Sequence, residues 1–324
     1  MILVTGGAGF IGSNFVLEWL ANPTAEGIIN LDKLTYAGNL ATLASLENDP
    51  RHIFVHGDIG DRGLVESLLQ KYQPRAIINF AAESHVDRSI HGPADFVQTN
   101  VLGTLNFLDG IKESSINAAI VITTDKVYKN KNLLRGYSET DELGGHDPYS
   151  NSKGCAELVT VAYRNSFFNP EKYTEHGVAI GTGRAGNVIG GGDWAADRLI
   201  PDFLRAIEAG KTLNVRSPKA IRPWQHVLEP LSGYLALAER LFNAGPDYGE
   251  GWNFGPVDWD VKPVQWIVEE LVDQWGGGAK WQLDNNSNPH EAHFLKLDCS
   301  KARDRLNWQP RWSLSTTLSS IVLW

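Results

Sequence analysis

A tyrosine and a lysine four residues apart are the first side chains whose spacing points to chemistry. Asp147 and Pro148 are expected to open a helix, which places Tyr149 and Lys153 at positions i and i+4. Both side chains then lie on one face of the helix. An ammonium group near a phenol favours the phenolate and lowers the pKa of a tyrosine from its usual value of about 10. Such pairs also occur on solvated helix faces, so the interpretation depends on the groups nearby.

A second group of reactive side chains follows the apolar segment 118–123. Thr124, Asp125 and Lys126 stand next to one another where this predicted strand ends. The Thr124 hydroxyl can hydrogen-bond a substrate hydroxyl while Tyr149 removes its proton and the carbon loses a hydride. Asp125 and Lys126 are either further acid–base groups or a surface ion pair.

A glycine-rich turn near the N-terminus predicts where the hydride acceptor binds. Gly6, Gly9 and Gly12 lie between an apolar strand and a helix that begins at Phe10 and Ile11. A turn without Cβ atoms lets a pyrophosphate approach the backbone, and the helix N-terminus directs N–H groups at it. The spacing is G-x-x-G-x-x-G rather than G-x-G-x-x-G, so a tight turn in another α/β protein is the alternative.

Acidic residues after the second and third predicted strands support a dinucleotide site. Asp32 ends the second strand, at a distance typical of the acid that binds an adenosine ribose. It would repel a 2′-phosphate and so favours NAD over NADP, although neighbouring Lys33 weakens this preference. Asp58 and Ile59 suit an adenine edge, and Asp58 is equally suited to cap the following helix.

Strands that alternate with helices about every thirty residues predict a doubly wound, parallel Rossmann sheet of the α/β class. After residue 176 the alternation loosens. We therefore expect an NAD-binding domain at 1–176 and a smaller, mixed α/β substrate domain at 177–324, with some segments returning to the sheet. The expected strands are 2–4, 28–31, 52–56, 76–80, 118–123 and 178–184, and the expected helices are 40–47, 61–72, 93–112, 148–167 and 198–208.

Residues at the end of the fourth predicted strand are expected to contact ligands. Ala81 and Ala82 follow this strand directly and are placed beside the cofactor. Glu83 and His85 come next and are placed beside a sugar. Ligands of open α/β sheets bind at the carboxyl ends of the strands, which is where these residues lie.

Several polar residues of the second predicted domain are candidates for binding an anionic substrate. Asn187 lies in a glycine-rich loop and can donate to a diphosphate, and Arg198 opens a helix. Arg216 and Arg222 flank a short segment, where either can pair with a diphosphate oxygen. For each arginine the alternative is a solvated surface position.

The segment 290–293, with His290 and His293, has the residue types of a metal site but not the spacing. Its histidines are three residues apart rather than four, and no third ligand is evident in the sequence. We predict no metal and place His290 near a nucleotide base instead.

The composition excludes several functional classes. The chain has 324 residues, of which 42% are hydrophobic and 21% are charged, and a net charge of −9. A basic footprint for nucleic acid is therefore not expected. Cys155 and Cys299 form no disulfide framework, and no apolar run approaches membrane-spanning length. The chain opens directly on a strand, so we expect no signal peptide, no membrane association and a cytoplasmic location.

Together, the glycine turn, Thr124 and the Tyr149–Lys153 pair resemble the extended short-chain dehydrogenase/reductase family over essentially the whole chain. Within it, Thr124-Asp125-Lys126 resembles sugar-nucleotide 4,6-dehydratases, enzymes of deoxysugar and lipopolysaccharide O-antigen biosynthesis. The resemblance implies that Asp125 protonates the departing C6 hydroxyl and that Lys126 removes the C5 proton. It also implies that Arg222 binds the diphosphate. A 4-epimerase or a catalytically idle NAD-binding protein are the alternatives.

The resemblance changes along the chain. Segments 30–39 and 81–89 resemble dTDP-glucose dehydratases, whereas segments from about residue 121 onward resemble CDP-glucose dehydratases. We therefore expect a hybrid with a seam near residues 105–119, and CDP-glucose before dTDP-glucose as the substrate. The resemblance further implies a homodimer through helices 93–112 and 148–167, and a further helix beyond Trp324.

Overall fold

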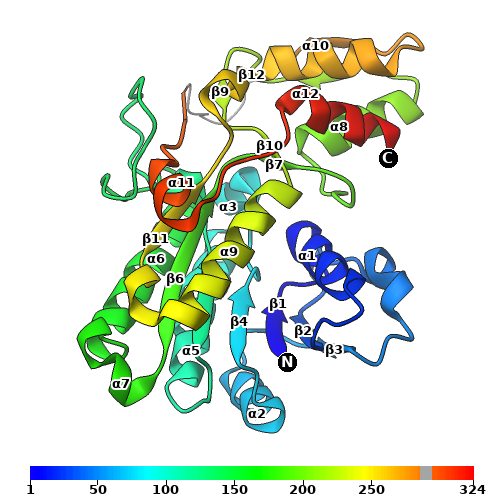
Figure 1. The fold of residues 1–324 in the computed structure, drawn as a ribbon. Coiled ribbons are helices and arrows are strands. Elements are labelled where there is room, and N and C mark those ends of the chain that lie inside the picture. The colour runs from blue at the N-terminus through cyan, green and yellow to red at the C-terminus, as the bar shows by residue number, and fades with distance from the viewer. Residues whose placement is uncertain (285–293) are drawn as a thin grey trace.

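A seven-stranded parallel sheet forms the centre of the molecule (Figure 1). The structure is a computed structural model that describes residues 1–284 and 294–324. The strand order changes direction between β1 and β4, where doubly wound sheets bind their ligands. The order is β3 (His52–His56), β2 (Ile28–Asp32), β1 (Ile2–Thr5), β4 (Ala76–Asn79), β5 (Ala118–Ile122), β6 (Ala179–Ala185) and β11 (Gly251–Phe254). The predicted fold class is confirmed.

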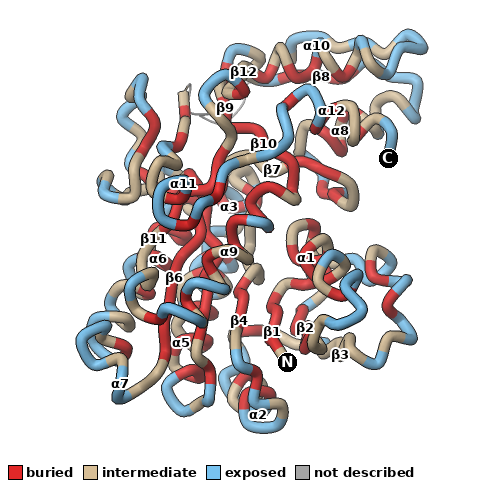
Figure 2. The backbone as a smooth tube through the Cα atoms, viewed as in Figure 1, coloured by how far each residue is buried: buried red, intermediate tan, exposed pale blue. Residues whose placement is uncertain are grey.

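Side chains along the central strands alternate between two hydrophobic cores. In β1, Ile2 and Val4 join one core and Leu3 joins the other. The first core is completed by α1 (Phe10–Ala21), α9 (Leu228–Ala244) and α11 (Ser300–Leu306), and the second by α2 (Arg62–Tyr72), α5 (Gly103–Ile111) and α6 (Pro148–Ser166). The sheet is thus buried on both faces, and Figure 2 shows its strands as predominantly buried backbone.

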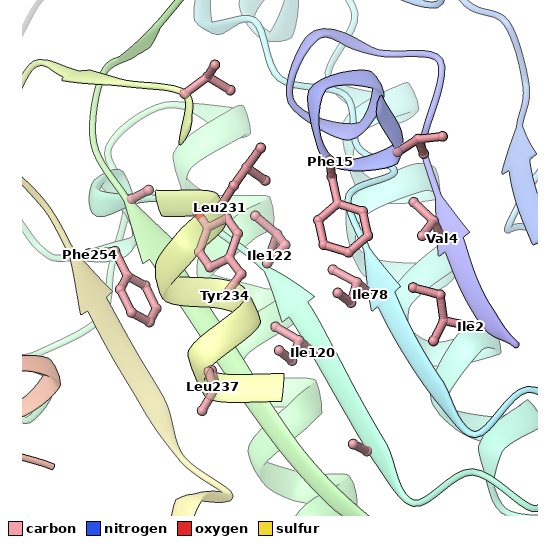
Figure 3. Packing of buried hydrophobic residues seen from close by; sticks show 14 of the residues in the cluster. Ile2, Val4, Phe15, Ile78, Ile120, Ile122, Leu231, Tyr234, Leu237 and Phe254 are labelled. Atoms are coloured by element: carbon pink, nitrogen blue, oxygen red, sulfur yellow. The ribbon is translucent and has the colours of Figure 1, made fainter. Parts of the chain in front are cut away.

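Helix α9 supplies much of the first core. Figure 3 shows Leu231, Tyr234 and Leu237 of this helix beside Ile120 and Ile122 of β5. Tyr234 and Leu237 have no exposed surface. Burial of these side chains fixes α9 against the centre of the sheet.

A smaller lobe with its own hydrophobic core lies beyond the upper ends of the strands in Figure 1. Its core includes residues of helices α8 (Leu199–Glu208), α10 (Val264–Trp275) and α12 (Leu314–Leu323). The lobe also contains three short strand pairs: β7 (Val188–Ile189) with β10 (Gln225–His226), β8 (Leu213–Val215) with β13 (Trp281–Leu283), and β9 (Ile221–Arg222) with β12 (Lys262–Pro263).

Short helical elements connect the two lobes and the strands. They are α3 (Val86–His91), α4 (Pro93–Phe96), α7 (Tyr173–His176), the π-helical turn η2 (Val97–Leu102), and the 3₁₀ turns η1 (Leu40–Leu46), η3 (Asp125–Val127), η4 (Pro170–Lys172), η5 (Gly245–Tyr248) and η6 (Asp258–Asp260).

Two predicted helices differ from the structure. The helix expected at 93–112 consists of α4, the π-turn η2 and α5, so it is one helical run with a widened turn. The segment expected as a helix at 40–47 forms 3₁₀ turns, which begin at Asn39 with its side chain accepting from the Ala41 N–H (3.0 Å).

The central sheet extends across the expected domain boundary. Strands β6 and β11 come from the chain after residue 176 and pair in parallel at the β5 edge of the sheet. The division at residues 176 and 177 stays a prediction. Within the part of the chain that the structure describes, no helix combines the length and apolarity needed to cross a membrane.

Leu237 offers a test of how much α9 contributes to stability. Leu237→Ala should lower the free energy of unfolding by about 2–5 kcal/mol, because it leaves a cavity in a fully buried position. Urea denaturation measures this loss. Leu134→Ala, at a leucine that is 87% exposed, is the matched control and should stay within about 0.5 kcal/mol of the parent. Equal losses in the two variants would contradict the assignment.

Candidate active site

One cleft of about 1140 Å³ runs along the carboxyl edge of the sheet and under the smaller lobe. Its volume exceeds that of a site for one small ligand, which is about 300–1000 Å³. Every predicted site residue within the described part of the chain lines it; His290 lies outside the described residues. These lining residues are Gly6, Gly9, Phe10, Ile11, Gly12, Asp32, Lys33, Asp58, Ile59, Ala81, Ala82, Glu83, His85, Thr124, Asp125, Lys126, Tyr149, Lys153, Asn187, Arg198, Arg216 and Arg222.

The glycine turn between β1 and α1 has no room for side chains at two positions. Gly6 has a φ of +70°, and a Cβ there would lie 2.6 Å from the backbone nitrogen of Ala81. A Cβ at Gly12 would lie 2.2 Å from the Gly6 carbonyl oxygen. No side chain caps α1 at Gly9. The N–H groups of the first helical turn therefore face the cleft as a candidate anion site.

Asp32 holds the turn that carries these glycines. Its carboxylate accepts from the backbone N–H of Ala8 (2.8 Å) and of Leu34 (2.8 Å). The side chain is also at the cleft wall, where its oxygens have remaining lone pairs for a ligand hydroxyl. Asp32 thus has a structural contribution that the sequence did not predict.

Asp58 pairs with Lys33 at the wall of the cleft. The Lys33 Nζ and the Asp58 carboxylate are 2.7 Å apart. Burial opposes ionisation of Asp58, but hydrogen bonds from Lys33 and the Gly60 N–H outweigh it and lower the pKa. Asp58 does not cap the next helix, because Asp61 is the residue whose side chain accepts from the Leu64 N–H (3.0 Å).

Thr124 and Asp125 form a buried pair at the end of β5. The Thr124 hydroxyl donates to Asp125 Oδ1 (3.0 Å) and accepts from the Lys126 backbone N–H (3.3 Å). Burial raises the pKa of Asp125, and the charge of Lys126 opposes this shift. Asp125 Oδ2 is buried and has no hydrogen-bond partner among the described residues. A protonated Asp125 can therefore donate to a group in the cleft.

Tyr149 and Lys153 lie on one side of α6, as predicted, but burial opposes the expected low tyrosine pKa. Burial raises the pKa of Tyr149 to about 12, although a hydrogen bond with Thr124 opposes the shift. The Lys153 ammonium donates instead to the Ile122 carbonyl (2.8 Å), and burial lowers the pKa of Lys153 to about 8. The sequence argument left out desolvation of the phenolate, to which the edge-on packing of Phe96 against the Tyr149 ring contributes.

Asn100, in the π-turn η2, joins two parts of the site through hydrogen bonds that the sequence did not predict. Its side chain accepts from the Glu83 N–H (3.0 Å) and donates to the Glu83 carbonyl (2.9 Å). It also donates to the Ser152 hydroxyl on α6 (2.9 Å). The loop after β4 is thereby held against the helix that carries Tyr149. Its only sequence signal was an amide inside an apolar helical segment.

The loop residues Glu83 and His85 face the cleft, and their pKa values are shifted in opposite directions. Burial and the charge of Asp95 raise the pKa of Glu83. Burial and nearby Arg198 lower the pKa of His85, and its Nδ1 has no partner among the described residues. A neutral His85 can therefore accept or donate a hydrogen bond to a ligand.

The predicted anion-binding residues divide into buried and paired groups. Arg222 is buried and donates to the Ile221 carbonyl (2.9 Å), and it lies close enough to Asp125 to affect the pKa of that carboxyl. Arg198 pairs with Asp193 (3.2 Å). Arg216 pairs with Asp87 (2.6 Å), so it joins the two lobes at the mouth of the cleft.

Asn187 is fixed through its main chain. Its carbonyl accepts from the Gln225 N–H (3.0 Å), which leaves the side chain at the cleft wall. Across residues 1–284 and 294–324, no three His, Cys, Asp or Glu side chains gather as a metal site would require.

Comparison with known proteins shows the family to which this chain belongs. A family model described as GDP-mannose 4,6 dehydratase matches residues 3–321. The chain belongs to this family. The CDP-glucose 4,6-dehydratase of Salmonella typhimurium is 49% identical over 329 residues, covering 100% of this chain and 89% of the relative.

Two further members of the 4,6-dehydratase group are similar over the whole chain. The dTDP-glucose 4,6-dehydratase of Xanthomonas campestris pv. campestris is 36% identical over 340 residues, covering 99% of this chain and 92% of the relative. A dTDP-glucose 4,6-dehydratase from Streptomyces venezuelae, solved with NAD bound, is 33% identical with a TM-score of 0.86 and covers 100% of this chain and 96% of that chain.

The expected seam within this dehydratase chain receives no support. The relative from Salmonella typhimurium aligns with the chain from end to end at 49% identity. The match gives one overall identity and shows no boundary within the chain, so the hybrid stays an unsupported prediction.

Lys153→Met tests the buried ammonium group of the dehydratase. Because the pKa of Lys153 is about 8 in the folded state and 10.5 in its ordinary range, charging it costs stability below about pH 8. Between about pH 8 and 10.5, Lys153 is neutral in the folded state but still protonated in the unfolded state. The free energy of unfolding of the parent therefore rises with pH in this range. The free energy of unfolding of Lys153→Met, taken relative to that of the parent, should therefore fall by about 2–3 kcal/mol over this range.

Urea denaturation of both proteins between pH 7 and pH 10.5 measures the difference. Exposed Lys211→Met controls for the loss of a lysine charge. A difference between parent and Lys153→Met that does not change with pH would contradict burial of the ammonium group.

Proposed function

We propose that this protein is an NAD-dependent nucleoside-diphosphate-glucose 4,6-dehydratase with CDP-glucose as its preferred substrate. The observation that carries the proposal is the convergence of Thr124, Asp125, Lys126 and Tyr149 on the cleft that begins at the glycine turn. The 49% identity to a CDP-glucose 4,6-dehydratase favours the cytidine nucleotide.

The glycine turn fits a dinucleotide. Gly6 and Gly12 leave the backbone accessible, and the uncapped start of α1 offers N–H groups for a pyrophosphate. Asp32 would bind the ribose hydroxyls, and its neighbour Lys33 is already paired with Asp58, so a 2′-phosphate finds little compensating charge. NAD, when bound, supplies the acceptor for a hydride from C4 and returns it at C6.

Tyr149 and Thr124 are proposed to act on the C4 hydroxyl. Thr124 hydrogen-bonds the phenol and can also bind the substrate oxygen. With a pKa of about 12, Tyr149 must be acidified before it removes a proton near neutral pH. The positive charge of an oxidised nicotinamide would act in this direction, in addition to that of Lys153.

Asp125 and Lys126 are proposed to remove water from C5 and C6. The raised pKa of buried Asp125 favours its protonated form, which can donate to the departing C6 oxygen. Lys126 would take the proton from C5. Because the C4 ketone acidifies C5–H, the two steps need only one acid and one base side by side at a strand end.

The smaller lobe is proposed to hold the nucleoside diphosphate. Arg222 is buried beside Asp125, where its guanidinium can bind a diphosphate oxygen and compensate charge near the acid. Arg198 and Asn187 line the same cleft. Glu83 and His85 would contact the hexose from the opposite wall.

Incubation of purified protein with CDP-glucose and dTDP-glucose separately tests the proposal. CDP-glucose should give a 4-keto-6-deoxy product that has lost one water, identified by mass spectrometry and NMR. Faster conversion of dTDP-glucose would reassign the base, for which the dTDP-glucose relatives provide precedent. C4 inversion without water loss would indicate an epimerase, and no turnover of either compound would overturn the proposal.

Lys126→Met separates oxidation from elimination. The variant should still oxidise C4, which accumulates bound NADH, but should lose at least about 100-fold in water loss because the C5 base is absent. Absorbance of bound NADH and product mass measure the two steps. Lys131→Met, at an exposed lysine paired with Glu142, is the control. Unchanged turnover would remove Lys126 from the mechanism.

A homodimer is proposed through the helical run α4–η2–α5 and helix α6. These helices pack beside one another, and their outer faces expose Val97, Leu102, Leu158 and Phe167. A two-fold interface between two such faces would bury them. A cytoplasmic location and a place in O-antigen synthesis likewise stay predictions.

Leu158→Glu tests this interface. Leu158 is 59% exposed on α6, and a carboxylate there should shift a dimer to monomer by size-exclusion chromatography with light scattering. Leu134→Glu, at a leucine that is 87% exposed and lies outside these helices, should leave the mass unchanged. A monomeric parent, or a dimeric Leu158→Glu variant, would contradict the assignment.

A further inference from the structure

Glu157 is a buried carboxylate on the helix that carries the Tyr149–Lys153 pair. It lies on α6 four residues after Lys153 and has no exposed surface. Its Oε1 accepts from the Thr123 hydroxyl (2.5 Å), and Thr123 is the neighbour of Thr124 in the chain. The carboxylate therefore touches the same strand end that carries the proposed catalytic groups.

Arg184 on β6 compensates this carboxylate. Its Nε donates to Oε1 (2.9 Å) and its Nη2 donates to Oε2 (2.9 Å), a bidentate pair in which both partners are at most 5% exposed. Thr182 of β6 donates a further hydrogen bond to Oε2 (2.7 Å). Glu157 thus receives four hydrogen bonds and links α6 to β5 and β6.

The cluster extends one strand further. Arg184 Nη1 donates to the Tyr128 hydroxyl (2.8 Å), which donates to Asn253 of β11 (2.7 Å). Arg184 is therefore held from both ends. A buried carboxylate with its hydrogen bonds filled and its position fixed on three elements acts as a stationary negative charge.

This negative charge bears directly on Lys153. Glu157 is the charged group that raises the pKa of Lys153 against the larger, opposing effect of burial. Arg184 donates to Glu157, and Arg164, whose Nη1 donates to the Ile180 carbonyl (3.2 Å), is also influenced by the Glu157 charge. The remaining described contact of Lys153 is the uncharged carbonyl of Ile122 (2.8 Å).

We propose that Glu157 is a positioning residue for the reaction: its fixed carboxylate keeps Lys153 in the ammonium form and directed at the Ile122 carbonyl, one turn from Tyr149. The inference rests on the proposed function, since it assigns Lys153 the task of favouring the Tyr149 phenolate. A carboxylate that only joined α6 to the sheet would affect stability without affecting the protonation of Lys153.

Glu157→Gln separates these roles, because glutamine keeps the shape and removes the charge. The pKa of Lys153 should fall by at least about one unit. NMR of ¹³C-lysine-labelled protein measures this value, with the signal assigned by its absence in Lys153→Met. This readout needs no turnover, so it stays decisive if the dehydratase proposal fails. Where turnover is present, the alkaline limb of the pH–rate profile should move to lower pH by the same amount.

Thr182→Val is the matched control. It removes one hydrogen bond from the same carboxylate but keeps both charges, so the pKa of Lys153 should stay within about 0.3 units of the parent. Because Glu157→Gln leaves Arg184 without its partner, Glu157→Gln/Arg184→Met provides a second variant without an unpaired buried charge. The pKa of Lys153 should fall in this variant too, but by less, because the positive charge of Arg184 is removed with the carboxylate. An unchanged pKa in either folded Glu157 variant, or an equal fall in Thr182→Val, would overturn the proposal.

Discussion

The buried ammonium group of Lys153 is the constraint on which the arrangement of the site depends. It donates to the carbonyl of Ile122, the last residue of β5, and so couples α6 to the strand end that carries Thr124. Removing an ammonium group from water costs several kcal/mol unless charge and hydrogen bonds compensate. Together with Glu157 and Arg184, Lys153 leaves one net positive charge in this buried cluster. A phenolate on Tyr149 would balance it.

Much of the fold followed from local sequence patterns. The strands were predictable because residues such as Ile28 and Ile29 form short apolar runs that a sheet covered on both faces requires. The π-turn was not, since hydrophobic spacing near 3.6 residues does not distinguish a regular helix from one with a single widened turn. The 3₁₀ turns at 40–46 were not predicted, for the same reason.

The candidate site was predictable where the chemistry is adjacent in sequence and not where it depends on distant residues. Residues of the glycine turn, the β5 end and the start of α6 meet in one cleft because carboxyl ends of parallel strands share an edge. The pKa of Tyr149 was misjudged because its burial comes from other segments, including Phe96. The pairing of Glu157 with Arg184 joins residues 27 positions apart and has no local signature.

The widened turn at η2 changes the phase of everything after it. One additional residue in a helical turn rotates the following segment by about 100° relative to an uninterrupted helix. Asn100 can therefore point toward Glu83 and Ser152 while Phe107 and Ile111 still face the core shared with α2. A single-residue deletion in this turn would restore a straight helix but turn one of these two faces outward. The widened turn thus lets one helical run direct side chains both toward the cleft and into the hydrophobic core.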